Sequence, residues 1–116
     1  MPSEERYIHF NLQEVHEAIS MGCIKEKREP LPEGRLTSIE IHEDDPDRQD
    51  SIYLHIEPSE GENERIKFDR KFFALSLVFY CQGSGIPIPA KGQKILNIKS
   101  DEIIVAITLA REALDA

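Results

Sequence analysis

The sequence lacks the residue patterns that stabilise small domains through covalent or metal cross-links. Its two cysteines, Cys23 and Cys81, form neither a CxxC pair nor a zinc-type spacing, and so sparse a pair is expected to stay reduced inside a cell. No basic segment followed by an apolar run and a small-residue cleavage site is present near Met1, which predicts no secretion signal. We therefore expect a cytoplasmic protein, and we predict no cofactor.

A long hydrophobic run is also missing. The longest run, residues 72–81, is half of the roughly 20 apolar residues that a membrane-spanning helix needs. In a chain of 116 residues, 40% of them hydrophobic and 31% charged, such a run is typical of a core helix in a soluble protein. We expect one domain over residues 1–116, with 1–8 and 112–116 as candidates for fraying, and no membrane association.

Positive charge is scarce in the first part of the chain. Residues 1–64 carry 6 Lys or Arg against 17 Asp or Glu, whereas residues 65–116 carry 8 against 5. The net charge of −8 repels polyanions, and no aromatic RNA-binding signature is present, so nucleic acid is disfavoured as a partner. The second part, residues 65–99 above all, is nevertheless a basic segment within an acidic protein.

The first helix is predicted to begin after Asn11. This residue is a suitable N-cap, and Glu14 three positions later completes a capping box. Gly22 can supply the left-handed residue that ends the helix. The following segment, residues 25–34, is charged and contains two prolines, which predicts a linker within the domain.

Three segments alternate apolar and polar residues and predict an antiparallel meander. They cover residues 36–43, 51–57 and 64–68. If paired residue numbers sum to 95 on the first two strands and to 122 on the last two, the isoleucines share one face. On the opposite face, Glu57 then lies opposite Arg65, and Glu40 lies beside His55. We expect the isoleucine face in the core and the charged face in solvent.

A second helix is predicted over residues 70–82, with Asp69 as N-cap. It is apolar around nearly its whole circumference, so it must be covered on more than one side. Residues 94–99 and 102–109 predict a hairpin whose pairs sum to 201 and whose faces are both apolar. The predicted fold is α+β in the order α-β-β-β-α-β-β: an antiparallel meander packed against the apolar helix, with a C-terminal β-hairpin that completes or extends the sheet.

The charged face of the meander offers candidates for a catalytic or metal site. His42 and His55 would lie roughly 7–8 Å apart along a diagonal, so they could share a divalent metal or act as acid and base together with Glu40. Glu57 is a further catalytic candidate on this face. The alternative is a solvated sheet whose charges balance, and we favour it because the carboxylates have basic neighbours.

The basic segment supplies a second set of candidates, for binding an anion or a nucleotide near the positive end of the second helix. These candidates are Arg70, Lys71, Lys91, Lys94 and Lys99. The alternative is that these side chains pair with the protein's own acidic surface or with that of a second copy.

The segment 86–89, with the sequence Ile-Pro-Ile-Pro, has two interpretations. A stiff extended segment can dock on a partner at low entropic cost, or it can be a rigid connector whose isoleucines enter the core. We favour the connector.

The apolar surplus of the second helix and the terminal hairpin predicts self-association, with a homodimer as the commonest solution. We therefore favour a non-enzymatic interaction or regulatory protein that acts as a small homo-oligomer, and another protein remains a candidate partner. The alternative is a metal- or acid-base-dependent enzyme that uses the outer sheet face.

Overall fold

The computed structural model describes residues 3–88 and 93–110 of the chain and contains two helices and six strands in that part. They are β1 (Ser3–Asn11), α1 (Leu12–Lys25), β2 (Arg35–Ile41), β3 (Ser51–Glu57), β4 (Glu64–Asp69), α2 (Arg70–Gly83), β5 (Gln93–Ile98) and β6 (Glu102–Ala110). The α+β class and the order α-β-β-β-α-β-β are confirmed from α1 onward. One further strand, β1, precedes them, so residues 3–8 are paired in a sheet where the sequence suggested fraying.

The strands form two separate antiparallel sheets of three strands each. The meander sheet has the order β2-β3-β4, and the terminal sheet has the order β1-β6-β5. The C-terminal hairpin therefore does not extend the meander, because β6 pairs with β1 along the whole of that strand. The residue pattern predicted no partner for β6 other than β5.

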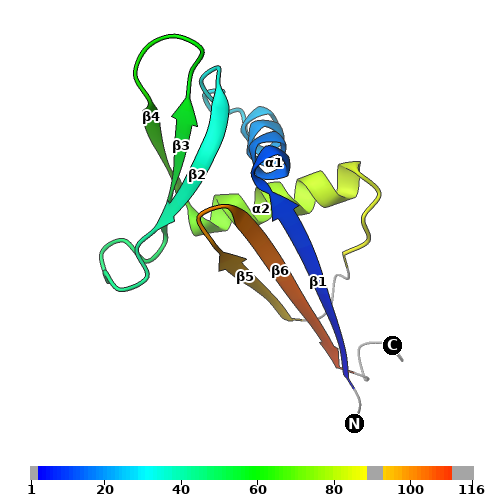
Figure 1. Cartoon of the computed structure of the whole chain (residues 1–116). Helices are drawn as coiled ribbons and strands as arrows, with labels where there is room; N and C mark the ends of the chain where they lie inside the picture. The colour runs from blue at the N-terminus through cyan, green and yellow to red at the C-terminus, as the bar shows by residue number, and fades with distance from the viewer. Residues whose placement is uncertain (1–2, 89–92, 111–116) are drawn as a thin grey trace.

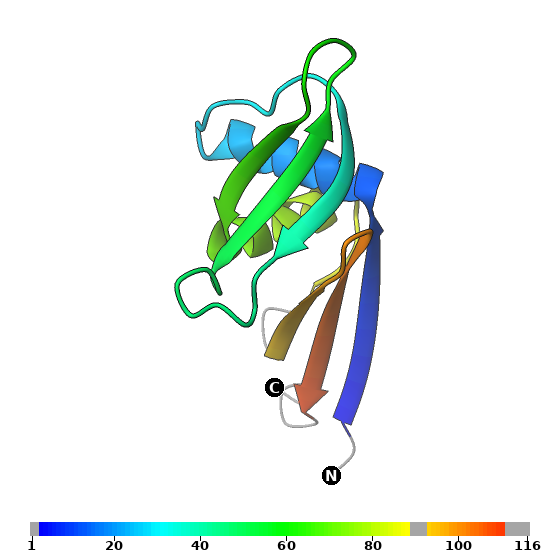
Figure 2. The same ribbon diagram turned by 60° about the vertical axis from the view of Figure 1, so that its left-hand side comes forward.

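The terminal sheet gives the molecule an elongated shape. The meander sheet lies over both helices, and the terminal sheet extends away from them toward the chain ends (Figures 1 and 2). The principal extents are 54 × 33 × 23 Å, and the radius of gyration is 15.5 Å, against about 13 Å for a compact domain of this length. Much of the terminal sheet is therefore covered on one face at most.

The meander buries the predicted face in a different register. Pairs on β2 and β3 sum to 93 from Ser38 to Ile41, with a bulge before Ser38, and pairs on β3 and β4 sum to 120. The predicted sums of 95 and 122 are wrong by two residues each, an even shift that keeps every side chain on its face. Ile52, Leu54 and Ile56 are accordingly fully buried. The terminal hairpin has the predicted register, with pairs that sum to 201.

Both predicted helix starts are confirmed. Asn11 and Glu14 form a reciprocal capping box, in which each side chain accepts a hydrogen bond from the backbone N–H of the other, at 2.8 and 3.0 Å. At the second helix, the Asp69 carboxylate accepts from the backbone N–H of Phe72 at 2.6 Å. These caps satisfy backbone donors that have no partner within the first turn.

The role predicted for Gly22 is wrong, because α1 continues past it to Lys25. Gly22 is buried where the two helices meet, and a Cβ atom built there would lie 2.0 Å from the Ser76 Oγ of α2. The glycine is thus required for the close approach of the helices. The chain takes its left-handed residue later, at Lys27, with φ of 54°.

The extension of α1 also accounts for the burial of Cys23. Cys23 follows Gly22 on the packed side of the helix and is 1% exposed. Cys81 on α2 is fully buried. Both are free thiols, and burial raises the pKa of each. Neither is therefore suited to act as a nucleophile.

The segment that follows α2 returns to the core. Ile86 and Ile88 are partly buried and pack against the core residues, which supports the interpretation of this segment as a connector. Pro89 lies outside the described residues. Of the helices in the described ranges, neither has the length and apolar character needed to cross a membrane.

Candidate functional site

The outer face of the meander sheet gathers three side chains around one carboxylate. The Nε2 atom of His55 lies 2.6 Å from Oε1 of Glu40, and the Nε2 atom of His42 contacts Oε2. Arg65 binds both oxygens, with Nε 3.0 Å from Oε1 and Nη2 2.7 Å from Oε2. We call Glu40, His42, His55 and Arg65 the Glu40 cluster. His42 lies one residue beyond β2 and two residues after Glu40, which keeps it on the same face, and the neighbouring strands β3 and β4 supply His55 and Arg65.

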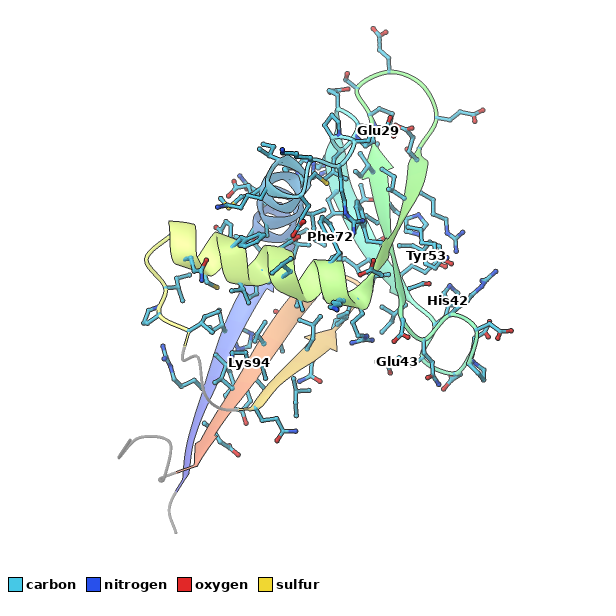
Figure 3. All side chains as sticks on the ribbon, turned by 180° about the vertical axis from the view of Figure 1, so that it is seen from behind. Glu29, His42, Glu43, Tyr53, Phe72 and Lys94 are labelled. Atoms are coloured by element: carbon cyan, nitrogen blue, oxygen red, sulfur yellow. The ribbon has the colours of Figure 1, made fainter. Side chains whose placement is uncertain are left out.

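Tyr53 forms the floor of the Glu40 cluster. It lies directly opposite Glu40 in the β2–β3 register. The Arg65 guanidinium lies 3.8 Å above its ring, and the His42 ring meets it edge-on at 5.6 Å between centroids. Only 7% of Tyr53 remains exposed, although it lies on the outer face, where Figure 3 shows it beside His42. The aromatic ring and the charges above it therefore hold one another in place.

The electrostatics of the cluster favour a permanently charged carboxylate. Hydrogen bonds from Arg65, His55 and His42, in that order of importance, hold the pKa of Glu40 well below its usual range. In return, Glu40 raises the pKa of Arg65. A general base works best with a pKa near the pH at which it operates. Glu40 is far from that condition, and its acceptor positions are already occupied.

The structure brings three of the four predicted catalytic candidates together. Glu40, His42 and His55 are in contact, whereas Glu57 lies opposite Arg35 at the other end of β3 and pairs with it at 3.4 Å. Within residues 3–88 and 93–110, no group of three or more His, Cys, Asp or Glu side chains is arranged to hold a metal ion. Both histidines that were candidate metal ligands direct Nε2 at a carboxylate that Arg65 also occupies.

The sequence placed Arg65 on the right face but opposite the wrong residue. With the predicted register, Arg65 pairs with Glu57, and the observed shift moves it opposite His55 and within reach of Glu40. The side-chain alternation contains no information that distinguishes registers two residues apart, since both bury the same face. The central position of Glu40 was therefore not predictable from this pattern.

The basic candidates meet acidic side chains around α2. Arg70, Lys71 and Lys94 line one groove between α2 and β5, and Asp50 and Asp69 line the same groove. Figure 3 shows Lys94 on the terminal sheet, away from the histidine-containing face. The groove therefore has mixed charge rather than the purely positive character that suits an anion.

Two of the four basic candidates that the structure describes form ion pairs. Arg70 lies 3.9 Å from Glu43, and Lys99 lies 3.6 Å from Glu102 within the terminal hairpin. Lys91 lies outside the described residues. These contacts favour the alternative in which the lysines and arginines balance the protein's own acidic groups.

A small apolar cavity lies between α2 and the terminal sheet. Its lining includes Phe10, Leu77, Cys81 and Val105, and its volume is about 70 Å³. Pockets for small molecules usually measure about 300–1,000 Å³. This cavity is therefore a packing defect rather than a site for a metabolite.

The sequence patterns did not predict a third surface, the outer face of the terminal sheet, because they did not predict β1. On the outer face of the terminal sheet, Tyr7 pairs with Ala106, which pairs with Ile95, so one row crosses all three strands. Tyr7 is 59% exposed and Ile95 is 47% exposed. We call these three residues the Tyr7 row. Ile104 lies in the next row, between His9 and Asn97. This face joins apolar side chains from both ends of the chain.

Comparison with known proteins adds no assignment. No protein-family model, curated protein or solved structure matches the chain. The two outer sheet faces differ in chemistry: the face of the meander sheet is polar and internally bonded, and the face of the terminal sheet is apolar and exposed.

Proposed function

We propose that this protein is a non-enzymatic interaction or regulatory protein that acts in the cytoplasm as a small homo-oligomer. The observation that carries the proposal is the Tyr7 row, in which an exposed tyrosine and an exposed isoleucine flank an alanine on one sheet face. Large apolar side chains gathered on a solvent-facing surface are typical of a contact site. Self-association removes these side chains from water and requires no other kind of protein.

The Glu40 cluster supports the same proposal from the other side of the molecule. Its carboxylate accepts from Arg65, His42 and His55, so its bonding capacity is used within the protein. An acid–base site needs a group that can exchange a proton near neutral pH. The lowered pKa of Glu40 favours a structural role instead.

Sedimentation velocity of the full chain at physiological salt tests the proposal. We expect a mass of twice the chain mass of 13.3 kDa at high micromolar concentration, with dissociation on dilution. Salt at this level screens the net charge of −8, which would otherwise oppose association. A single species of 13.3 kDa at every concentration would contradict the proposal.

The alternative, an enzyme that uses a metal or acid–base pair, is favoured by one observation, the meeting of two imidazoles at one carboxylate. Zinc titration followed by NMR of His42 and His55 tests the metal-dependent form of this alternative. Unchanged imidazole signals at micromolar zinc exclude a metal-dependent enzyme at this face, whereas saturable shifts of both rings support it.

A further inference from the structure

We propose that two copies associate through the outer faces of their terminal sheets, about a two-fold axis parallel to the strands, with Tyr7 of each copy packed on Ile95 of the other. This inference rests on the proposed homo-oligomer, and it adds the surface, the symmetry and the central contact. The product is a sandwich of two three-stranded sheets.

The outer face of the terminal sheet has apolar side chains at its centre and polar side chains around them. Tyr7, Ala106 and Ile95 form one row, and Ile104 adds an apolar side chain in the next row. Around this centre stand exposed polar residues, which are Glu5, His9, Asn11, Gln93, Asn97 and Lys99. Specific interfaces between proteins have this arrangement of an apolar centre within a polar rim. The outer face of the meander sheet has the reverse order, with charges at its centre.

The strand order of the terminal sheet favours this axis. The strand order β1-β6-β5 places β6 in the middle, so a two-fold axis parallel to the strands exchanges β1 and β5 and keeps β6 opposite β6. Tyr7 then faces Ile95 on both sides of the interface, and Ala106 faces Ala106. Each side therefore has the same combined side-chain size, and the two sheets stay evenly separated at about 10 Å, as aligned sheets do.

A two-fold axis in the plane of the interface but perpendicular to the strands fits less well. It places Tyr7 on Tyr7 along one side and Ile95 on Ile95 along the other. The first pair needs a wider gap than the second, so the sheets would be held apart as a wedge. Close packing disfavours this arrangement because voids lose van der Waals contacts.

The charges on the outer face of the terminal sheet also permit self-association. A chain with a net charge of −8 can approach a copy of itself only through a face of low charge. On the terminal sheet, Glu102 lies 3.7 Å from His9 and 3.6 Å from Lys99. Glu5 accepts a hydrogen bond from the Tyr7 hydroxyl at 3.2 Å. Because the tyrosine hydroxyl is neutral, Glu5 keeps its charge, whereas Lys99 neutralises Glu102, so the outer face brings little net charge to the interface.

The rim pairs are compatible with the same axis. Glu5 and Gln93 flank Thr108 in one row, and His9 and Asn97 flank Ile104 in another. Exchange of β1 and β5 places Glu5 opposite the Gln93 amide of the second copy, and His9 opposite Asn97. Glu5 and His9 thus each meet a neutral amide, whereas Glu102 on β6 faces Glu102 of the second copy and keeps Lys99 as its ion-pair partner.

The size of the face sets the strength of the association. Three strands about 4.8 Å apart and about seven residues long, at about 3.3 Å per residue, cover roughly 300 Å² in projection. Even with the relief of the side chains, the total area buried falls below the roughly 1,600 Å² of a standard interface. We therefore expect a reversible dimer that exchanges subunits.

The test uses three variants of the full chain, all at exposed positions. Ile95→Glu and Tyr7→Lys each place a charge at the centre of the interface, and each is expected to weaken dimerisation at least about tenfold. Ile24→Glu is the matched control, because Ile24 lies on α1 and is 76% exposed. It should leave the dimer unchanged. Far-UV circular dichroism of each variant checks that the fold is retained.

Mixing the Ile95→Glu and Tyr7→Lys variants tests the axis itself. In a mixed dimer, the introduced lysine faces the introduced glutamate, and the other side keeps the natural tyrosine–isoleucine contact. We expect the mixture to sediment as a dimer although each variant alone is monomeric. Loss of the dimer in both variants without rescue on mixing would overturn the parallel axis.

The outcomes separate this inference from the proposed function. A wild-type protein that is monomeric at all concentrations contradicts both. A wild-type dimer that persists in the Ile95→Glu and Tyr7→Lys variants overturns the interface and leaves the homo-oligomer standing. Dissociation caused by Ile24→Glu alone would place the interface on α1.

Discussion

The two three-stranded sheets present opposite chemistry on their outer faces. On the meander sheet, Glu40 accepts from three side chains, and the Arg65 guanidinium covers Tyr53. On the terminal sheet, Tyr7 and Ile95 stand exposed on either side of Ala106. The meander sheet thus has the chemically reactive side chains, but their hydrogen-bonding groups are already paired within the protein. The terminal sheet has exposed apolar side chains, whose burial against a partner would still be favourable.

This difference shows that residue types alone do not identify a working surface. Two histidines and two glutamates on one sheet face suggest chemistry when their contacts are unknown. Once Glu40 is seen to hold His42, His55 and Arg65 together, the same residues account for the stability of the face instead. What remains available for a partner is the surface whose groups are not already bonded.

The largest effect on the free energy of unfolding is expected on β6, where adjacent residues lie on opposite faces of the terminal sheet. Ile103 is fully buried, whereas Ile104 points to the outer face. Ile103→Ala should lower the free energy of unfolding by about 2–5 kcal/mol because it leaves a cavity. Ile104→Ala should cost less than about 1 kcal/mol in the monomer. Urea unfolding at low protein concentration measures both, and a reversed order would show that the two faces are exchanged.

A smaller effect is expected from the centre of the Glu40 cluster. Glu40→Gln leaves the Arg65 guanidinium without its countercharge, and the site is partly exposed to water. We expect a loss of about 1 kcal/mol in the free energy of unfolding. Thermal and urea unfolding at neutral pH measure it. A variant as stable as the wild type would show that the cluster adds nothing to the fold.

The same substitution should change the response to acid. The pKa of Glu40 is lowered in the folded protein, so its contribution to stability is present above the unfolded-state pKa of about 4.3 and is lost as the pH falls below it. The stability difference between wild type and Glu40→Gln should therefore shrink as the pH falls below about 4.3. Urea unfolding as a function of pH tests this. A difference that grows in acid would contradict the lowered pKa.

The smallest effect is expected from Glu57→Gln, which makes the same chemical change on the same sheet. The side chains of Arg35 and Glu57 are 79% and 53% exposed and lie 3.4 Å apart. Exposed pairs of this kind contribute little, so we expect a change within about 0.5 kcal/mol. If urea unfolding shows the same loss of stability for Glu57→Gln and Glu40→Gln, the Glu40 cluster stabilises the fold no more than the isolated pair of Arg35 and Glu57 does.

The local features of the fold were predictable from the sequence. The caps at Asn11 and Asp69 and the register of the terminal hairpin are all confirmed. Each depends on residues a few positions apart, so the chemistry that determines it is visible in a short window. The apolar face of the meander is also correct, since alternation alone fixes which side chains are buried.

The features that depend on distant residues were not predictable. β1 is mostly polar, and its partner β6 lies at the other end of the chain. No local signal distinguishes such a strand from a frayed terminus. For the same reason the Tyr7 row was invisible, because it exists only when β1, β6 and β5 lie side by side. The composition of the Glu40 cluster also depended on a register that turn lengths, rather than alternation, determine.

The contact between Gly22 and Ser76 has a consequence for how this sequence can change over time. A methyl group at position 22 would collide with Ser76 Oγ at 2.0 Å and with its Cβ at 2.8 Å. A larger residue at one position is therefore tolerable only if the other shrinks. In diverged chains that keep this helix pair, the residues at positions 22 and 76 should covary. This pair of small residues would indicate common ancestry even where the residues on both outer sheet faces had been replaced.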